Sequence, residues 1–222
     1  MQDEKITVKV ENIHKYYEKD KIILQDINLI VKKKEIISIL GTSGSGKSTL
    51  LSLIGLLDKA NKGRISFPCI KRKYNHDEIR LKHIGFIYQS HCLLRNFTIL
   101  ENIMLPALLK GDNIRTAQSN SALLLKQVGI YDKKDNFFYQ LSEGQCQRAS
   151  IVRSIINKPN LILADEPTGN LDKKNSLIVF NMLKTIVLDN DSSCILLTHD
   201  QDLAKLSSSC YQLHNGMLIK KI

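Results

Sequence analysis

The stretch ISILGTSGSGKSTLLSLIG, residues 37–55, places three glycines and one lysine between two apolar runs. Residues 36–40, which precede the glycines, are mostly isoleucine and leucine and favour a buried β-strand. The residues that follow the lysine favour the start of a helix. The stretch therefore predicts a strand, a glycine-rich loop and a helix, in that order.

Residues 41–48 fit the pattern G-x-x-x-x-G-K-[ST]. Glycines let the backbone N–H groups point inward at phosphate oxygens, and the helix N-terminus adds partial positive charge. Lys47 can reach the β- and γ-phosphates, Ser48 can offer its hydroxyl to Mg²⁺, and Thr49 can contact the α-phosphate. The alternative is a glycine-rich turn without a ligand, which the flanking strand and helix disfavour. The predicted nucleotide loop consists of Gly41, Thr42, Ser43, Gly44, Ser45, Gly46, Lys47, Ser48 and Thr49.

A second apolar strand, residues 161–165, ends in two adjacent carboxylates. A site that hydrolyses a nucleotide needs one group that binds the metal ion and another that activates the attacking water. Asp165 can hold Mg²⁺ through its water shell, and Glu166 can polarise the water. Two carboxylates could also merely end a strand, but a phosphate loop upstream favours the chemical interpretation.

Two further segments narrow the class of nucleotide site. In LSEGQCQRASIVRS, residues 141–154, Ser142 and Gln145 have the spacing of a capping box at a helix start. A plain capped helix does not predict the Gly144 between them. His199 follows the strand pattern of residues 193–198. A lone histidine is usually a surface residue, but after this strand it is a candidate sensor of the γ-phosphate.

Strand and helix patterns alternate along the chain, which predicts an α/β fold with a parallel sheet. A tight hairpin is expected at residues 215–216. The pattern from residue 98 to residue 157 is mostly helical. We therefore expect one domain of 222 residues, with a core lobe of about residues 1–89 and 158–222 and a helical lobe of about residues 90–157. The expected strands are residues 6–10, 27–31, 36–40, 63–67, 84–88, 161–165, 193–198 and 210–214.

Composition limits the location and the partners. No apolar run reaches the length of about 18–20 residues that a spanning helix needs, and the charged, strand-like N-terminus does not predict a signal peptide. We therefore expect a cytoplasmic protein unless a partner holds it at a membrane. The net charge is +10, but the lysines occur in short runs without interleaved aromatic residues, so no nucleic-acid partner is expected. The five cysteines are scattered, which favours reduced structural thiols.

With these motifs in this order, the chain resembles the ATP-binding subunits of ABC transporters over nearly its whole length. Gly41–Ser48 matches the Walker A motif, and Asp165-Glu166 matches the end of Walker B. Leu141–Gln145 resembles the LSGGQ signature, and residues 170–172, NLD, resemble the D-loop. The resemblance implies a P-loop NTPase with a RecA-like parallel-sheet core, an N-terminal antiparallel β-subdomain and an inserted α-helical subdomain.

The same resemblance implies roles for individual residues, with ATP and Mg²⁺ as cofactors. The implied catalytic residues are Glu166, His199, Gln89 and Lys47, and the implied metal residues are Ser48, Gln89 and Asp165. Tyr17 stands where an aromatic ring stacks on adenine, with Tyr16 as the alternative. An ATP-dependent homodimer is implied, with two ATP molecules between two chains. Ser142 and Gly144 are implied to face the nucleotide held by the other chain, and Gln145 and Asp172 are further implied nucleotide-binding residues.

One position departs from the family pattern, because the third residue of the signature is Glu143 and not glycine. A carboxylate at a helix N-terminus is favourable by about 0.3–1 kcal/mol, but near a triphosphate it would repel the ligand. We expect the side chain to point away from the nucleotide, and turnover to be slower than with LSGGQ.

The amino-acid sequences of several segments, including residues 85–106 and ADEPTGNLD, are similar to those of the lipoprotein-releasing ATPases of Gram-negative bacteria. This implies a peripheral protein at the cytoplasmic face of the inner membrane, bound to a heteromeric pair of transmembrane permease subunits. Leu93, Leu94 and Phe97 are candidates for lining the groove that receives a permease helix. Three alternatives remain open: a MacB-type peptide or drug exporter, an FtsE-like cell-division ATPase, and a nucleotide-binding scaffold without useful turnover.

Overall fold

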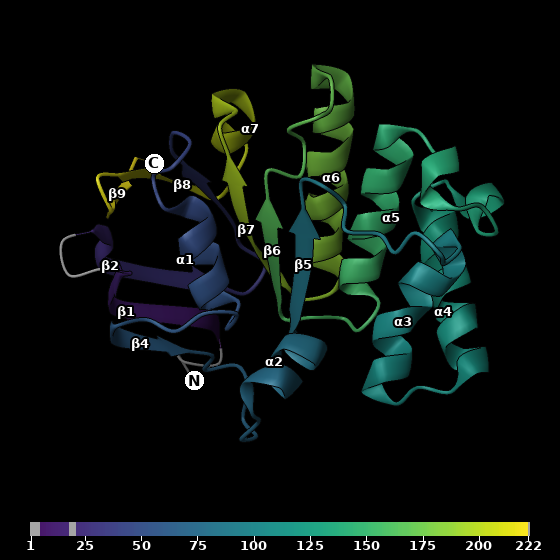
Figure 1. Ribbon diagram of the computed structural model, residues 1–222, viewed down its shortest axis with the longest axis horizontal. Helices are drawn as coiled ribbons and strands as arrows, with labels where there is room; N and C mark the ends of the chain where they lie inside the picture. The colour runs from purple at the N-terminus through teal and green to yellow at the C-terminus, as the bar shows by residue number, and fades with distance from the viewer. Residues whose placement is uncertain (1–4, 18–20, 222) are drawn as a thin grey trace.

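The computed structural model describes residues 5–17 and 21–221. In this part of the chain the strands form two sheets (Figure 1). A three-stranded antiparallel sheet has the order β2-β1-β4, and a six-stranded sheet has the order β5-β6-β7-β3-β8-β9. The larger sheet is parallel except for the β8–β9 pair. The strands are β1 (Ile6–Tyr16), β2 (Ile22–Lys32), β3 (Ile36–Leu40), β4 (Lys62–Ser66), β5 (Ile84–Tyr88), β6 (Leu161–Asp165), β7 (Ser193–Thr198), β8 (Ser209–His214) and β9 (Met217–Lys220).

The helices lie between these strands and, in the middle of the sequence, form a separate group. They are α1 (Lys47–Ile54), α2 (His76–His83), α3 (Ile99–Lys110), α4 (Ile114–Gln127), α5 (Glu143–Ile155), α6 (Lys173–Asp189) and α7 (Gln201–Lys205), with the short 3-10 helices η2 (Tyr131–Lys133) and η3 (Phe138–Gln140). None of the helices in the described ranges combines the length and the hydropathy that crossing a membrane would require.

Both faces of β3, β6 and β7 are buried, which explains why these strands are largely apolar without alternation. Successive side chains of a strand point to opposite faces. In β6, Leu161 and Leu163 therefore join a core shared with α1, whereas Ile162 and Ala164 join a core shared with α5, α6 and α7. Figure 1 shows the same arrangement, with α1 on one side of β5–β7 and α6 on the other.

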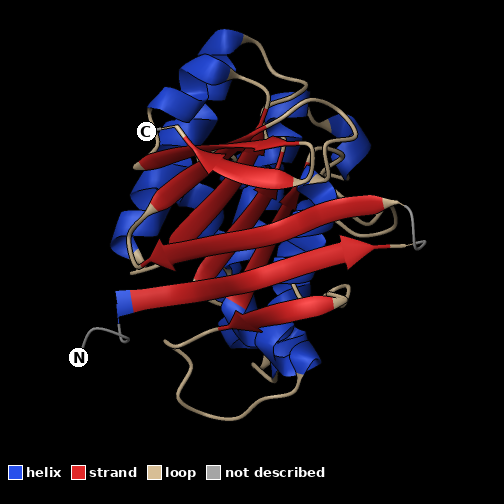
Figure 2. Ribbon diagram, turned by 90° about the vertical axis from the view of Figure 1, so that its left-hand side faces the viewer, coloured by secondary structure: helices blue, strands red, loops and turns tan. Residues whose placement is uncertain are grey.

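The antiparallel sheet covers α1's side of the molecule, and its long strands cross the strands of the larger sheet (Figure 2). Strands β1 and β2 are longer than the predicted ranges 6–10 and 27–31. Each bends at a residue with left-handed φ, Asn12 (47°) and Asp26 (50°), and the register of the pair shifts near them. The Asn12 side chain donates to Asp26 Oδ1 at 2.8 Å across the two strands. Such bulges do not follow an alternating pattern, so the predicted range ended too early for β1 and began too late for β2.

Helices α3, α4 and α5 share a core cluster of their own, built around Ile103, Leu125 and Val152. Figure 1 places this helical group beyond β5, at the end of the molecule opposite β1 and β2. The expected fold class, a parallel-sheet core with an antiparallel β-subdomain and an inserted helical lobe, is confirmed. The lobe boundaries 90–157 and 1–89 with 158–222 stay a prediction.

Helix α2 was not predicted from the sequence. It has no buried residue, so it carries no apolar stripe that periodicity could detect. Its signal is local: the Asn75 side chain accepts from the N–H of Glu78, and the Glu78 side chain accepts from the N–H of Asn75. The hairpin prediction at residues 215–216 is confirmed, because Asn215 and Gly216 have φ of 49° and 73° between β8 and β9.

Candidate functional site

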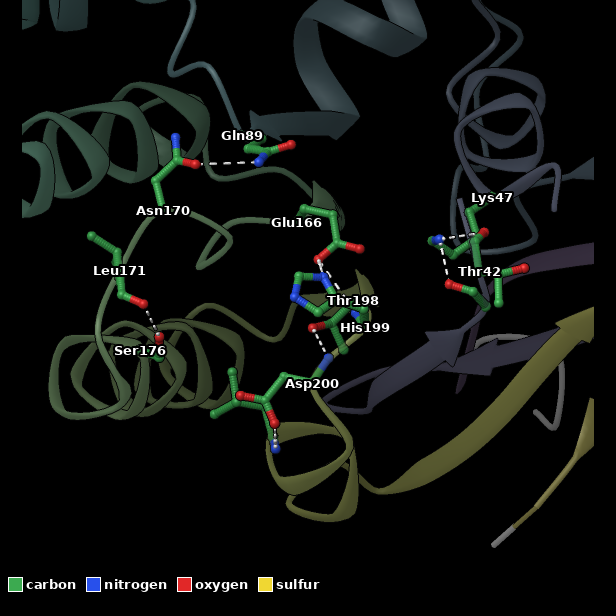
Figure 3. A network of polar contacts seen from close by, with 12 residues as sticks. Thr42, Lys47, Gln89, Glu166, Asn170, Leu171, Ser176, Thr198, His199 and Asp200 are labelled. Atoms are coloured by element: carbon green, nitrogen blue, oxygen red, sulfur yellow. Dashed lines mark hydrogen bonds and ion pairs between the residues drawn. The ribbon is translucent and has the colours of Figure 1, made fainter. Parts of the chain in front are cut away.

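The strand register brings four segments that are distant in sequence to one edge of the larger sheet. Leu40 at the end of β3 pairs with Thr198 at the end of β7, and Asp165 at the end of β6 pairs with Leu197 and with Tyr88 at the end of β5. Because these strands are parallel, the residues that follow them leave the sheet at the same edge. These residues are the glycine loop, Glu166, Gln89 and His199, and Figure 3 views them together.

The glycine loop turns tightly into α1. Gly44 and Gly46 have φ of 77° and 99°, a region that other residues rarely adopt. A Cβ at Gly41 would lie 2.6 Å from Ser45 Oγ and 2.9 Å from the carbonyl oxygen of Leu213. At both kinds of position a side chain would displace the loop. Glycine is thus required by the backbone path itself.

The loop offers positive groups, and no anionic side chain among the residues that the structure describes is paired with them. Helix α1 begins at Lys47 without a side-chain cap and without an acidic residue in its first turn. The Lys47 ammonium donates to the carbonyl oxygens of Gly41 (2.6 Å) and Thr42 (3.1 Å), which are neutral partners (Figure 3). Ser45 Oγ is buried without a partner in the described residues. The cradle therefore fits an anion such as phosphate.

Glu166 stands at the centre of the edge in a constrained conformation. Its φ is 47°, and its N–H donates to the carbonyl oxygen of Leu197 at 3.0 Å. Its Oε2 accepts from the N–H of His199 (3.3 Å) and lies 2.9 Å from His199 Nδ1 (Figure 3). The Glu166 side chain is 15% exposed and that of His199 is 70% exposed. A shielded carboxylate held by an accessible imidazole is an arrangement suited to moving a proton.

Gln89 and the segment after Glu166 are linked directly. Gln89 Nε2 donates to Asn170 Oδ1 at 3.3 Å (Figure 3). Gly169 lies so close that a Cβ there would be 2.9 Å from Gln89 Nε2. Asp172 caps α6, because both the N–H and the side-chain amide of Asn175 donate to its carboxylate at 2.8 Å. These hydrogen bonds, first that from the Asn175 N–H, hold the pKa of Asp172 below its ordinary value.

The same edge of the sheet also fits a metal ion whose ligands come partly from the protein and partly from a phosphate. The described residues contain no cluster of three or more His, Cys, Asp or Glu side chains that could hold a metal. Mg²⁺ commonly takes one carboxylate, a hydroxyl, phosphate oxygens and waters. Asp165, half-buried at the end of β6, and Ser48, exposed on the first turn of α1, are side chains of the right chemistry.

The signature segment forms the predicted capping box. Ser142 Oγ accepts from the N–H of Gln145 at 3.4 Å, and Gln145 Oε1 accepts from the N–H of Ser142 at 2.9 Å. A Cβ on Gly144 would meet nothing within 4 Å, so the helix start is open there. Helices α1 and α5 pack on opposite faces of the larger sheet. A single chain therefore does not bring its signature helix to its own phosphate loop.

Tyr17 is more accessible than its neighbour Tyr16. Tyr16 ends β1 and pairs with Ile22, and it is half-buried. Tyr17 is 62% exposed, with its hydroxyl 3.4 Å from Asp58 Oδ2 and the Lys15 ammonium 4.8 Å from its ring centroid. Because Lys15 contacts this ring and most of the side chain is still exposed, Tyr17 is better placed than Tyr16 to stack on a ligand.

Comparison with known proteins decides the family. Residues 24–169 match the family model described as ABC transporter. The chain belongs to the ABC transporter family. It is an ATPase of that family, and its α/β fold is that of the family's P-loop cassettes.

ABC proteins similar to this chain over almost their whole length include three named lipoprotein-releasing system ATP-binding protein LolD. That of Rickettsia felis is 44% identical over 212 residues, which cover 94% of this chain and 96% of the relative. That of Wigglesworthia glossinidia brevipalpis is 40% identical and covers 97% of each chain. That of Treponema denticola is 40% identical and covers 89% of each chain.

Solved ABC cassettes have the same fold. A dimeric post-hydrolysis state of the ATP-binding cassette MJ0796 bound to ADP and phosphate is 32% identical, with a TM-score of 0.85 over 96% of this chain and 97% of that chain. The cassette CbiO1 from Clostridium perfringens, part of a transporter complex, is 26% identical, with a TM-score of 0.87 over 97% of this chain and 87% of that chain.

The three residues predicted to line a permease groove differ in exposure, and their role in binding a permease helix stays a prediction. Leu94 and Phe97 are 42% and 39% exposed, whereas Leu93 packs against the core of the helical lobe. Sequence reasoning missed the aromatic neighbours of this surface. Phe137, Phe138 and Tyr139 line a surface hollow of about 630 Å³ together with Arg95 and Asn96. The run FFY at residues 137–139 was a signal that could have marked it.

Proposed function

We propose that the chain hydrolyses ATP to drive a membrane complex that releases lipoproteins from the bacterial inner membrane. The observation that carries this proposal is full-length similarity, since the LolD protein of Rickettsia felis covers 94% of this chain and 96% of itself at 44% identity. A shared ATPase domain alone would support only the family. The similarity here also extends through the helical lobe, where this family contacts its membrane partners.

Phosphate binding in this proposal begins with Lys47. In the chain its ammonium donates to the carbonyl oxygens of Gly41 and Thr42, and an ATP phosphate offers a stronger, charged acceptor. The N–H groups of residues 44–49 surround the phosphates at the start of α1. Tyr17 stacks on the adenine. Asp165, Ser48 and Gln89 would hold Mg²⁺, which neutralises phosphate charge when bound.

Hydrolysis relies on the chain's own proton-handling groups. Glu166 accepts the proton of the attacking water, and its low exposure excludes competing solvent. His199 orients Glu166 through the 2.9 Å contact and, with 70% of its side chain exposed, can turn toward the γ-phosphate. Gln89, which lies at the same edge of the sheet, would help to position the water.

The remaining donors are supplied by a second copy of the chain. Because α5 packs on the face opposite α1, Ser142, Gly144 and Gln145 serve the nucleotide bound to the partner. Asp172 of the D-loop, which caps α6, faces the same interface. ATP therefore favours a closed dimer with two nucleotides inside it, and hydrolysis returns the dimer to the open state.

The partners that follow from this proposal are a heteromeric pair of transmembrane permease subunits. The exposed side chains of Leu94 and Phe97 and the hollow beside Tyr139 form the surface on which a permease helix docks. The chain is then a peripheral protein at the cytoplasmic face of the inner membrane, and no nucleic acid takes part.

The motor is tested by comparing the purified chain with Glu166→Gln. The wild-type chain should hydrolyse MgATP. The variant should bind ATP and form a dimer that sediments as two chains, while turnover falls by about a thousandfold or more, because the amide cannot accept a proton. Equal turnover of the two proteins would contradict the proposal that the chain is an ATP-driven motor, and would favour a nucleotide-binding scaffold.

The cargo is tested by capturing the tagged chain from native membranes in mild detergent. Two different membrane subunits together with acylated proteins would support lipoprotein release. A single homodimeric membrane partner without acylated proteins would contradict it and favour an exporter or a cell-division complex.

A further inference from the structure

The first residue of the signature helix carries a carboxylate with two partners outside the helix. Glu143 Oε1 accepts from Asn170 Nδ2 at 3.0 Å and lies 3.0 Å from His91 Nε2. Asn170 lies in the loop after Glu166, and His91 lies in the turn after Gln89. The residue that departs from the family signature therefore contacts both loops that carry the hydrolytic groups of its own chain.

The same loops are linked to each other. Asn170 Oδ1 accepts from Gln89 Nε2 at 3.3 Å (Figure 3), while Asn170 Nδ2 donates to Glu143 Oε1 at 3.0 Å. Both ends of the Asn170 amide are thus used. Because Gln89 and His91 belong to one turn, the contacts close a ring that runs from Gln89 through Asn170 and Glu143 to His91.

The turn at residues 90–92 is strained and needs support. His91 and Cys92 have φ of 58° and 53°, a left-handed conformation that is unfavourable for residues other than glycine. Arg153, ten residues further along α5, donates to the carbonyl oxygens of Cys92 (2.6 Å) and His91 (2.9 Å). Helix α5 therefore holds this turn at two points, its backbone through Arg153 and its imidazole through Glu143.

Only one neutral tautomer of the His91 imidazole can donate a hydrogen bond to Glu143. The residue is 8% exposed, and its Nδ1 is buried without a partner among the described residues. A proton on Nε2 makes a hydrogen bond to Glu143, whereas a proton on Nδ1 would make none. Glu143 thus accepts two hydrogen bonds, and these partners, first Asn170 and then His91, hold the pKa of its carboxyl below the ordinary value.

We propose that Glu143 is a positioning residue that holds the start of α5, the turn after Gln89 and the loop after Glu166 as one mechanical unit. This inference rests on the proposed function, in which the start of α5 faces the nucleotide of a second copy. The unit then connects the hydrolytic loops of one site with the phosphate donors of the other. Closure at one nucleotide is thereby transmitted to the second.

The first test needs no nucleotide. Hydrogen exchange is compared for the wild-type chain, Glu143→Ala and Glu143→Gln, with Asp132→Asn as a control that removes an exposed carboxylate of the helical lobe. In Glu143→Ala, amides of residues 88–95 and 168–173 should exchange about tenfold faster or more, while β3 and β7 stay protected. Glu143→Gln should resemble the wild type, because its side-chain oxygen can accept both hydrogen bonds. If both loops exchanged as slowly in Glu143→Ala as in the wild-type chain, the proposal would be overturned.

The second test measures ATP hydrolysis as a function of ATP concentration with the same proteins. Glu143→Ala should lower kcat about fivefold or more and reduce the cooperativity between the two sites, while the affinity for ATP is kept. Glu143→Gln should recover both properties. If Glu143→Gln were impaired as much as Glu143→Ala, charge and not hydrogen bonding would be responsible, and the proposal would fail. A wild-type chain without hydrolysis would overturn the proposed function instead, and exchange would still decide the role of Glu143.

Discussion

At the scale of single residues, the proposed function makes turnover depend on the pair of Glu166 and His199. We expect His199→Ala to lower kcat by about ten- to a thousandfold, because the carboxylate loses the imidazole 2.9 Å away and the γ-phosphate loses a hydrogen-bond partner. ATP affinity should be kept, since Lys47 and the glycine loop are unchanged. Steady-state kinetics and nucleotide titration measure the two properties. His76→Ala, at the exposed start of α2, is the control and should leave both unchanged.

Lys15 and Asp58 form a second residue pair, beneath Tyr17. The Lys15 side chain is 8% exposed and lies 2.9 Å from Asp58 Oδ1 and 2.8 Å from Oδ2. The hydrogen bond from Lys15 holds the pKa of Asp58 below its ordinary value. Asp58→Asn should therefore lower the free energy of unfolding by about 1–2 kcal/mol at pH 7, because Lys15 stays buried without its counter-charge.

The pH dependence of this effect follows from the direction of the pKa shift. A carboxyl whose pKa is lower in the folded chain stabilises the fold fully above the unfolded value of about 3.9. This stabilisation is lost as the pH falls through the lower, folded value. Urea unfolding from pH 7 down to about pH 3 should show wild type and Asp58→Asn converging at the acid end. A constant difference across this range would contradict the assignment.

At the scale of elements, two helices offer a matched comparison. Helices α3 and α5 begin with the same capping box, Thr98 with Glu101 and Ser142 with Gln145. Thr98→Ala and Ser142→Ala should each lower the free energy of unfolding by about 1 kcal/mol. Only Ser142→Ala should also lower ATP turnover, because in the proposed function α5, and not α3, presents its start to a nucleotide. Thermal unfolding and steady-state kinetics measure the two effects, and an equal loss of turnover in both variants would contradict the role of Ser142.

The elements differ in how well the sequence predicts them, and the reason is physical. The strand, loop and helix around Lys47 and the Asp165-Glu166 pair are local patterns, so each could be found by itself. Parallel pairing then places them at one edge without further information. Helix α2 has no apolar face and could not be found by periodicity. The partners of Glu143 lie 52 and 27 residues away in sequence, and only the folded backbone brings His91 and Asn170 together.

At the scale of the whole molecule, α1 and α5 pack on opposite faces of the larger sheet, so the proposed site is complete only with a second chain. A mixing experiment tests this. Lys47→Ala lacks the phosphate lysine, and Ser142→Ala lacks a signature donor. A mixed dimer contains one site in which both groups are intact, because the Ser142→Ala chain supplies the lysine and the Lys47→Ala chain supplies the serine. The mixture should hydrolyse ATP faster than the mean of the two separate variants, whereas a site built within one chain would show no gain.

The order of strands in the larger sheet also has a consequence for synthesis. Strand β3, which carries the phosphate loop, lies between β7 and β8, and both neighbours come from residues 193–214. On the ribosome, β3 emerges long before either partner, so its backbone groups have no ladder to join. A message truncated before residue 193 would encode the complete glycine motif and the Asp165-Glu166 pair, yet its product should hold no nucleotide. We therefore expect the nascent polypeptide to bind ATP only after β7 and β8 have left the exit tunnel.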